Sequence, residues 1–196
     1  MRGVVGLLLA AGAGRRFGTD KRWQPLADGT PLVLASASRL RGACSDVLAV
    51  LRPDDAALGE RLQELGCRVV VNPDAEAGLG SSLAAGVRAS ADAAGWLVAL
   101  ADMPFIASAS HQAVQERLLA GASVVVPTHD GQRGHPVGFS REWLGELSRL
   151  DGDVGARHIL REHADRVEVL AVDDSGILAD VDRPDDLDRS GKLPVS

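Results

Sequence analysis

Short apolar runs alternate with longer Ala-rich stretches along most of the chain. The short runs are β-branched or Leu-rich and have the length of buried strands, and the Ala-rich stretches have the length of helices. This alternation is typical of βαβ units, in which helices pack on the faces of a sheet. It predicts strands over residues 4–10, 47–51, 68–71, 96–100, 123–127, 136–140 and 167–172, and helices over residues 31–40, 54–65, 81–91, 110–120, 141–147, 154–163 and 184–188.

The spacing becomes tighter after Pro127, and there the pattern predicts an antiparallel excursion. We therefore expect an α/β fold whose sheet is mixed. The 196 residues suit one domain with a full core and are too few for two comfortable domains. That domain is expected over residues 1–190, followed by a C-terminal tail over residues 191–196.

The composition narrows the possible functions. The apolar fraction of 45% suits a globular protein, and no apolar run reaches the roughly 18 to 20 residues that span a bilayer. The net charge of −6, together with only three Phe, three Trp and no Tyr, argues against a nucleic-acid partner. Cys44 and Cys67 lack metal-ligand spacing and are interpreted as structural thiols. We expect a soluble, cytoplasmic protein with a small-molecule substrate and no membrane partner.

The segment after the first strand combines glycines with basic residues. Gly12 and Gly14 let backbone N–H groups approach a triphosphate closely, and the cations Arg15, Arg16 and Lys21 can neutralise its charge. An ordinary Gly-rich turn is the alternative, but it does not explain three basic residues among the glycines. The segment is therefore a candidate phosphate-binding loop.

Two better-known phosphate loops fit this segment poorly. A Walker loop needs Ser or Thr after its Lys, whereas Arg22 follows Lys21 here. A dinucleotide fingerprint needs a third Gly where Phe17 stands, and Arg52 follows the second strand where an acid usually binds the ribose.

Aspartates follow the strand over residues 96–100 and recur near the C-terminus. Because parallel sheets bind ligands at the carboxyl edge, Asp102 is expected near the Gly-rich segment, where it can hold Mg²⁺ against phosphates. Asp180 and Asp182 point the same way if their run is extended, and Asp182 is preferred as the second metal-binding carboxylate. The alternative is that these acids only cap helices, form turns or remain solvated.

Two further regions are candidates for substrate contacts. Gly78 and Gly80 lead into a predicted helix whose first N–H groups, with Ser81 and Ser82, can line a base and ribose pocket. Helix capping alone also explains the two serines. A second region looks like an acceptor pocket, although a His or an Asp there is more often structural when taken singly. Its residues are Arg133, Gly134, His135, Pro136, Asp153 and Arg157.

These segments together resemble the molybdenum cofactor cytidylyltransferases, within the larger group of nucleotidyltransferases similar to molybdenum cofactor guanylyltransferase. The resemblance covers almost the whole chain. Its matching pieces, in order, are residues 9–18 with Lys21, 78–83, 101–104, 133–136, 152–157 and 180–187.

The resemblance implies a Rossmann-like three-layer sandwich with a mixed, mainly parallel sheet, of the nucleotide-diphospho-sugar transferase type. It implies transfer of CMP from CTP to the terminal phosphate of molybdopterin or the molybdenum cofactor, with Mg²⁺ held by Asp102 and Asp182. It further implies that Arg16, Lys21 and Asp102 are catalytic and that a molybdoenzyme receives the product. The residues implied in nucleotide binding are Leu9, Ala10, Ala11, Gly12, Gly14, Arg15, Arg16, Lys21, Gly80, Ser81, Ser82 and Asp102.

A few residues bear on the choice of base and acceptor. Ala10-Ala11-Gly12 is similar to the CTP branch, whereas the GTP branch tends to have Ala-Gly-Gly. The residues over 22–24 depart from the apolar residues that usually follow the loop Lys, and Leu79 and Arg183 are further departures. The alternatives are GTP with the same acceptor, transfer to a sugar or polyol phosphate, and a non-catalytic carrier of the finished cofactor. An NAD-binding dehydrogenase is the weakest alternative, because its fingerprint fails at Phe17.

Overall fold

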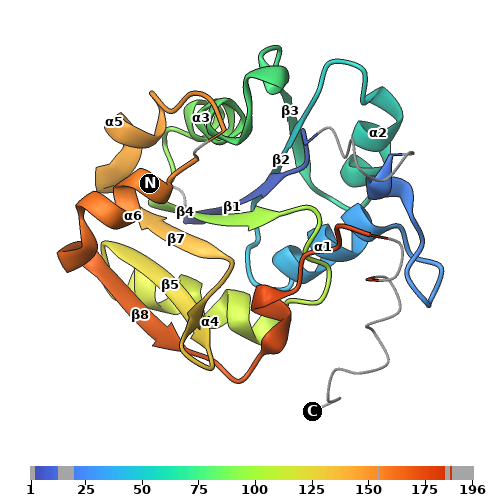
Figure 1. Ribbon diagram of the computed structural model, residues 1–196. Helices are drawn as coiled ribbons and strands as arrows, with labels where there is room; N and C mark the ends of the chain where they lie inside the picture. Colours follow the sequence, from blue (N-terminus) through green and yellow to red (C-terminus); the bar gives the residue numbers. More distant parts are fainter. Residues whose placement is uncertain (1–2, 13–19, 154, 184–185, 187–196) are drawn as a thin grey trace.

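The computed structural model describes residues 3–12, 20–153, 155–183 and 186. An eight-stranded sheet lies between two layers of helices (Figure 1). No helix among these residues combines the length and the apolarity that crossing a bilayer requires. The strands are β1 (Val4–Leu9), β2 (Val47–Leu51), β3 (Arg68–Val71), β4 (Gly95–Leu100), β5 (Val124–His129), β6 (Gln132–Arg133), β7 (Val137–Ser140) and β8 (Val167–Ala171). The α-helices are α1 (Leu32–Arg41), α2 (Ala56–Glu64), α3 (Leu79–Ala89), α4 (Ser108–Leu119), α5 (Leu144–Leu147) and α6 (Arg157–Glu162), and the 3-10 turns are η1 (Lys21–Trp23), η2 (Ala75–Ala77), η3 (Arg141–Trp143), η4 (Ala164–Arg166) and η5 (Ser175–Leu178).

The sheet is mixed, and its two halves differ in direction. Neighbouring strands are parallel in the half ordered β3-β2-β1-β4, whereas β7 runs antiparallel to both β4 and β5. The outer strands β6 and β8 both pair with β5, β6 antiparallel and β8 parallel. The predicted α/β sandwich with a mixed, mainly parallel sheet is thus confirmed, and the antiparallel strand lies where the spacing tightens after Pro127.

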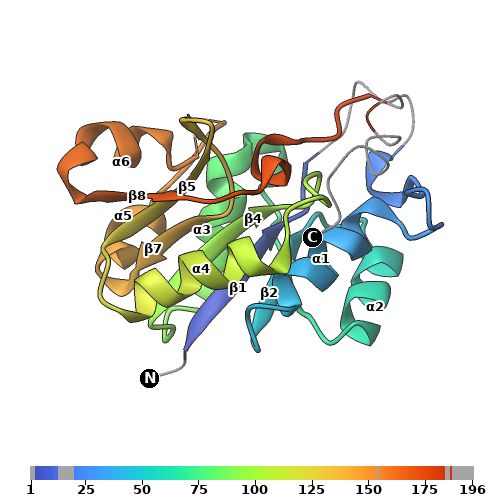
Figure 2. The same ribbon diagram turned by 90° about the horizontal axis from the view of Figure 1, so that it is seen from below.

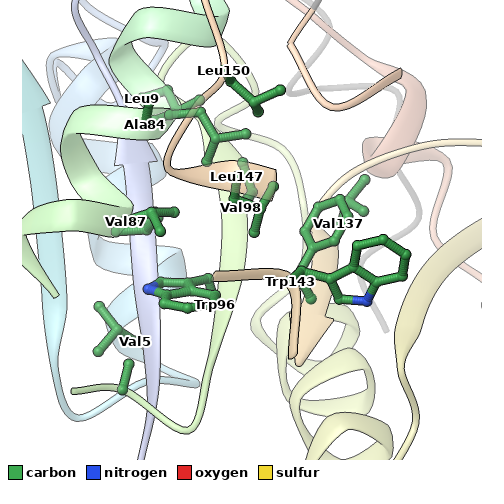
Figure 3. Close-up of a cluster of buried hydrophobic side chains, with 14 of the residues drawn as sticks. Val5, Leu9, Ala84, Val87, Trp96, Val98, Val137, Trp143, Leu147 and Leu150 are labelled. Carbon is green, nitrogen blue, oxygen red and sulfur yellow. The ribbon is translucent and has the colours of Figure 1, made fainter. Parts of the chain in front are cut away.

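Successive residues of β1 belong to two different cores, because strand side chains alternate between the faces of a sheet. Val5 and Leu7 pack in a cluster with residues of α3, α5 and α6, whereas Val4 and Leu8 pack with residues of α1, α2 and α4. Figure 3 shows part of the first cluster, with Trp96 among aliphatic side chains. Figure 2 shows α1 and α4 side by side across the opposite face. Burial on both faces explains why the central strands read as continuous apolar runs.

The predicted helix starts differ from the observed ones by one to three residues, and glycines explain two of these differences. The third helix begins at Leu79 rather than at residue 81, because Gly78 takes a φ of +120° immediately before it and no side chain caps the helix. The sixth begins at Arg157 rather than at residue 154, and Gly155 lies before it with a φ of +55°. The serines near the start of α3 therefore lie inside its first turns and do not cap it.

A few predicted or missed pieces lie at the margins. The two residues of β6 were not predicted, because a strand this short carries no periodic pattern and is formed by the turn at Asp130 and Gly131, which both have positive φ. The expected helix over residues 184–188 lies outside the described residues except for Asp186, and so does the expected tail over residues 191–196.

Candidate active site

Lys21 joins the two carboxylates that the sequence predicts for metal binding. Its Nζ donates hydrogen bonds to Oδ2 of Asp102 at 2.8 Å, to Oδ1 of Asp182 at 3.3 Å and to the carbonyl oxygen of Val181 at 3.0 Å. Burial opposes the charge of the ammonium, but the bonds and charges of Asp102 and Asp182 outweigh it and raise the pKa of Lys21. Lys21 is therefore a cation at neutral pH, held between both acids.

Asp102 reaches this point at the carboxyl edge of the central strand β4. The N–H of Ala101 donates to the carbonyl oxygen of Leu9 at 3.1 Å, and the hydroxyl of Ser36 on α1 donates to the carbonyl oxygen of Ala101 at 2.8 Å. The N–H of Val181 donates to the carbonyl oxygen of Asp102 at 2.9 Å and thereby brings the C-terminal segment alongside. The backbone is fixed on both sides, while the carboxylate itself is 27% exposed.

The donor set at this edge suits a hard divalent cation. The side chains of Asp102 and Asp182 are 27% and 50% exposed, so their carboxylate oxygens are accessible to an ion. Oxygen ligands of this kind are preferred by Mg²⁺ and Mn²⁺. Within the described ranges, no group of three or more His, Cys, Asp or Glu side chains could enclose a metal. A bound cation would therefore take further oxygens from water and substrate phosphates, as Mg²⁺ does at nucleotide sites.

A cleft of about 490 Å³ lies beside Lys21 and Asp102. The end of β1, the start of α3 and the loop after α5 contribute to its walls. Of the residues implied in nucleotide binding, it is lined by Leu9, Ala10, Ala11, Gly12, Lys21, Ser82 and Asp102. Three others, Gly14, Arg15 and Arg16, lie outside the described residues.

Two glycines bring the start of α3 against the loop that carries Asp153. A Cβ on Gly78 would lie 2.2 Å from Oδ1 of Asp153, and one on Gly80 would lie 2.6 Å from the carbonyl oxygen of Asp151. The N–H of Gly80 donates to the carbonyl oxygen of Gly152 at 2.7 Å. Because only glycine permits this approach, the two segments form one wall. Asp153, which the sequence assigns to the acceptor, lines the same cleft as the residues at the end of β1 that are predicted to bind the nucleotide.

A buried asparagine supports the two serines of α3. Nδ2 of Asn72 donates to the hydroxyl oxygens of Ser81 at 3.0 Å and Ser82 at 3.2 Å. Ser81 in turn donates to the carbonyl oxygens of Asp74 and Gly78, so it fixes the turn before α3, whereas Ser82 lines the cleft. Sequence reasoning missed Asn72, and its only signal is a polar residue directly after β3.

The other residues assigned to the acceptor lie on the antiparallel half of the molecule. Arg133 is exposed on β6, and Arg157 is exposed at the first position of α6. Gly134 passes so close to η5 that a Cβ would lie 2.3 Å from the carbonyl oxygen of Ile177. Pro136 is buried and follows a cis peptide bond. The segment over residues 133–136 thus has a tightly packed backbone and carries one exposed cation, Arg133.

His135 lies in the same segment, within electrostatic range of Asp102 and Asp180. Its Nδ1 is buried and has no hydrogen-bond partner among the described residues. Burial lowers the pKa of His135, although a hydrogen bond with the backbone of Val98 and the charges of Asp102 and Asp180 act in the other direction. The imidazole is therefore neutral at pH 7 and within electrostatic range of Asp102.

An ion-pair network next to Lys21 was not predicted. Arg22 is only 3% exposed and pairs with Asp20 and Asp55, and Arg52 pairs with the same two aspartates. Burial opposes the charge of Asp55, but its bonds with Arg22 and Arg52 prevail and lower the pKa of Asp55 to about 2. The available signal was Arg22 itself, which departs from the apolar residues that usually follow the loop Lys in the cytidylyltransferases that the chain resembles.

Comparison with known proteins identifies the family. A model described as the MobA-like NTP transferase domain matches residues 6–167. The chain is 32% identical over 194 residues to nicotine blue oxidoreductase of Paenarthrobacter nicotinovorans, with 95% of both chains covered. It is 32% identical over 199 residues to the purine catabolism protein PucB of Bacillus subtilis, with 94% of both chains covered. A shorter match, 39% over 71 residues and 35% of each chain, is to a probable molybdenum cofactor guanylyltransferase of Thermococcus gammatolerans.

A solved structure supports the same assignment. Rv0371c of Mycobacterium tuberculosis, in complex with manganese, is 30% identical and superposes with a TM-score of 0.77, covering 93% of this chain and 95% of that one. The expected fold of the nucleotide-diphospho-sugar transferase type is confirmed. The family match includes Lys21 and Asp102 and ends before Asp182. The chain therefore belongs to the MobA-like NTP transferase family and is a nucleotidyltransferase.

Proposed function

We propose that this nucleotidyltransferase transfers CMP from CTP to the terminal phosphate of molybdopterin or the molybdenum cofactor and releases pyrophosphate. The main support is the contact of Lys21 with both Asp102 and Asp182, beside a cleft lined by the end of β1. An ammonium and two accessible carboxylates at a nucleotide cleft meet the needs of triphosphate chemistry with a divalent cation.

The reaction is an in-line displacement at the α-phosphorus of the nucleotide. A phosphate oxygen of the acceptor forms the new P–O bond, and the bond from the α-phosphorus to the bridging oxygen breaks, so that its electron pair leaves with pyrophosphate. A phosphate nucleophile is already anionic at neutral pH, so no general base is required. Positioning and charge stabilisation then carry catalysis. Lys21 suits this role because its raised pKa keeps it charged, and Arg16 is proposed from the sequence as a second cation.

Asp102 and Asp182 are proposed to hold Mg²⁺. Mg²⁺ bound there would stabilise the negative charge that develops on the phosphate oxygens. The manganese complex of the mycobacterial relative supports a divalent cation in the family, and the choice of magnesium belongs to the proposal.

The acceptor is proposed to bind between the cleft and the antiparallel half of the sheet. Arg133 and Arg157 are exposed cations that suit an anionic acceptor, and the neutral His135 has an Nδ1 without a partner within the described structure. Gly134 and Pro136 would shape the backbone between them. Asp153 lines the nucleotide cleft and would lie where the two substrates meet.

Cytosine is proposed as the base because the run Ala10-Ala11-Gly12, which resembles the CTP branch, lines the cleft. The relative from Thermococcus gammatolerans is named a guanylyltransferase, so GTP is the direct alternative.

The test is pyrophosphate release from CTP, GTP, ATP and UTP with Mg²⁺, with and without a molybdopterin-type acceptor. We expect release that needs the acceptor and prefers CTP. A preference for GTP would show that the base is guanine rather than cytosine. Pyrophosphate release only with a sugar or polyol phosphate would show that this phosphate is the acceptor in place of molybdopterin. Binding of the finished cofactor without NTP consumption would indicate a carrier.

An oxidoreductase is the second candidate, because one relative of nearly full coverage has that name. The structure argues against a dinucleotide site of the usual kind. Arg52 stands after β2, where an acid usually binds the ribose, and it is paired with Asp20 and Asp55. Loss of NADH or NADPH absorbance in the presence of a reducible heterocycle, without pyrophosphate release from any NTP, would favour this candidate.

A further inference from the structure

Arg22 takes no part in the proposed chemistry, yet it is the most deeply buried charged side chain beside the cleft among the described residues. We propose that Arg22 is a positioning residue, which fixes Lys21 relative to the end of β1 and thereby gives the enzyme its affinity for the triphosphate part of its substrate. The inference rests on the proposed function, in which Lys21 contacts the triphosphate.

The guanidinium of Arg22 is bonded in three directions. Nη1 donates to the carbonyl oxygen of Ala10 at 2.7 Å, which is the residue after β1. Nε and Nη2 donate to Asp20 at 2.8 and 2.5 Å, and Nη1 and Nη2 donate to Asp55 at 2.5 and 2.6 Å. One side chain thus ties the end of β1 to the turn η1 that carries Lys21, and ties both to the start of α2.

Asp55, the partner of Arg22 at the start of α2, is itself held in place by further hydrogen bonds. Asp55 is 7% exposed and accepts hydrogen bonds from the N–H of Arg52 at 3.0 Å and from its Nη2 at 3.1 Å. Charge-assisted hydrogen bonds are strong and directional when water is excluded. The position of Arg22 is therefore set by the sheet and by α2, and the turn η1 takes its position from Arg22.

Consecutive residues of η1 send their side chains to opposite partners. Lys21 reaches Asp102 and Asp182, whereas Arg22 reaches Ala10 and Asp55. A turn of three residues has little rigidity of its own, so its orientation depends on what anchors it. The planar fork of Arg matches this set of acceptors, and a Lys side chain, with one ammonium group, cannot reach all of them at once.

The experiment compares Arg22→Met and Arg22→Lys with the control Arg68→Met. Arg68 makes a bidentate pair with Asp46 at 2.8 and 3.0 Å, at the opposite end of the sheet from the cleft. The control therefore loses an ion pair of similar geometry that has no contact with Lys21. Affinities of the full chain for CTP, CMP and inorganic pyrophosphate are measured by calorimetry with Mg²⁺, and thermal melts check that each variant is folded.

Both Arg22 variants should lose about tenfold to 100-fold in affinity for CTP and pyrophosphate, because a displaced Lys21 loses its contact with the phosphates; a misplacement of about 1 Å can cost about 100-fold in reaction rate. Their affinity for CMP should stay within about twofold of the wild type, and Arg68→Met should change none of the three. An equal loss for CTP and CMP would overturn the inference, because it indicates general damage.

Two further outcomes are decisive. If Arg22→Met does not fold, Arg22→Lys decides, because it keeps a buried cation beside Asp20 and Asp55, and wild-type affinity for CTP in this variant would overturn the inference. A wild-type protein that binds CTP no better than CMP would refute the proposed function itself, and this outcome is seen before any variant is made.

Discussion

Two clusters of charge lie side by side at the carboxyl edge of the sheet and differ in what surrounds them. The open cluster consists of Lys21, Asp102 and Asp182. The closed cluster consists of Asp20, Arg22, Arg52 and Asp55. In the open cluster the two carboxylates are 27% and 50% exposed, so a metal ion or a phosphate can replace the contacts seen here. In the closed cluster the central pair is 3% and 7% exposed, and removing one partner leaves a charge without water.

This difference shows that a salt bridge has no fixed role. Adjacent cations, each paired with two aspartates, are proposed to serve substrate chemistry in one cluster and to fix the position of the backbone in the other. Burial separates the two roles, because exposed pairs contribute little to stability while a broken buried pair is costly. The open cluster should therefore respond to mutation mainly in turnover, and the closed cluster mainly in stability and substrate affinity.

The largest effect is expected for Asp102→Ala in the open cluster. The variant should lose about 1000-fold in kcat, equivalent to about 4 kcal/mol, because the carboxylate that is proposed to hold the metal ion at the reacting phosphates is lost. Its melting temperature should stay close to that of the wild type. Steady-state pyrophosphate release measures the effect, and Asp165→Ala, at an exposed position in η4, is the control. Near-normal turnover would remove Asp102 from the chemistry.

Stability should separate the two neighbouring cations. Arg22→Met should lower the free energy of unfolding by about 3 kcal/mol, because Asp55 loses its buried partner and keeps only the more exposed Arg52. Lys21→Met should lower it by less than about 1 kcal/mol, since its partners are accessible to water. Urea unfolding measures both values. Equal losses for the two variants would remove the distinction between the clusters.

The open cluster could be predicted from the sequence because its members follow simple rules. Lys21 belongs to a Gly-rich segment after the first strand, and Asp102 directly follows the apolar run of β4. Strands that are buried on both faces also have a strong signal, and the sequence predicted every strand except the short β6. The exceptions were local, such as the start of α3, where the backbone angle of Gly78 decides the boundary.

The closed cluster could not be predicted, because its contacts arise only when distant elements pack. The bonds from Arg22 to Ala10 and to Asp55 span 12 and 33 positions, and no periodicity in the sequence relates these residues. An Arg near a loop is also expected to be exposed, since fully buried Arg is rare unless it is paired. The pairing itself is the information that the sequence lacks.

The stability of the fold at acid pH should depend on the closed cluster, through the carboxylate of Asp55. The pKa of Asp55 lies at about 2 in the folded protein, below the ordinary value of 3.8. Its ionised form therefore stabilises the fold fully above pH 3.8, and this contribution is lost as the pH falls toward 2. The loss is about 2 kcal/mol. Asp55→Asn should flatten this part of the stability curve, measured by unfolding at several pH values. An unchanged slope would show that Asp55 does not contribute to the acid sensitivity.

The smallest effect is expected for Asp182→Asn, and it tests how far the open cluster extends. Asp182 is more exposed than Asp102, and its bond to Lys21 is longer, at 3.3 Å against 2.8 Å. A peripheral ligand of this kind should change the affinity for metal more than the rate at saturation. We expect about a tenfold higher Mg²⁺ requirement, with kcat largely recovered at high Mg²⁺. Titration of activity with Mg²⁺ measures the shift. An unchanged Mg²⁺ requirement would mean that Asp182 only balances the charge of Lys21, and Asp102 would then be the single protein carboxylate assigned to the ion.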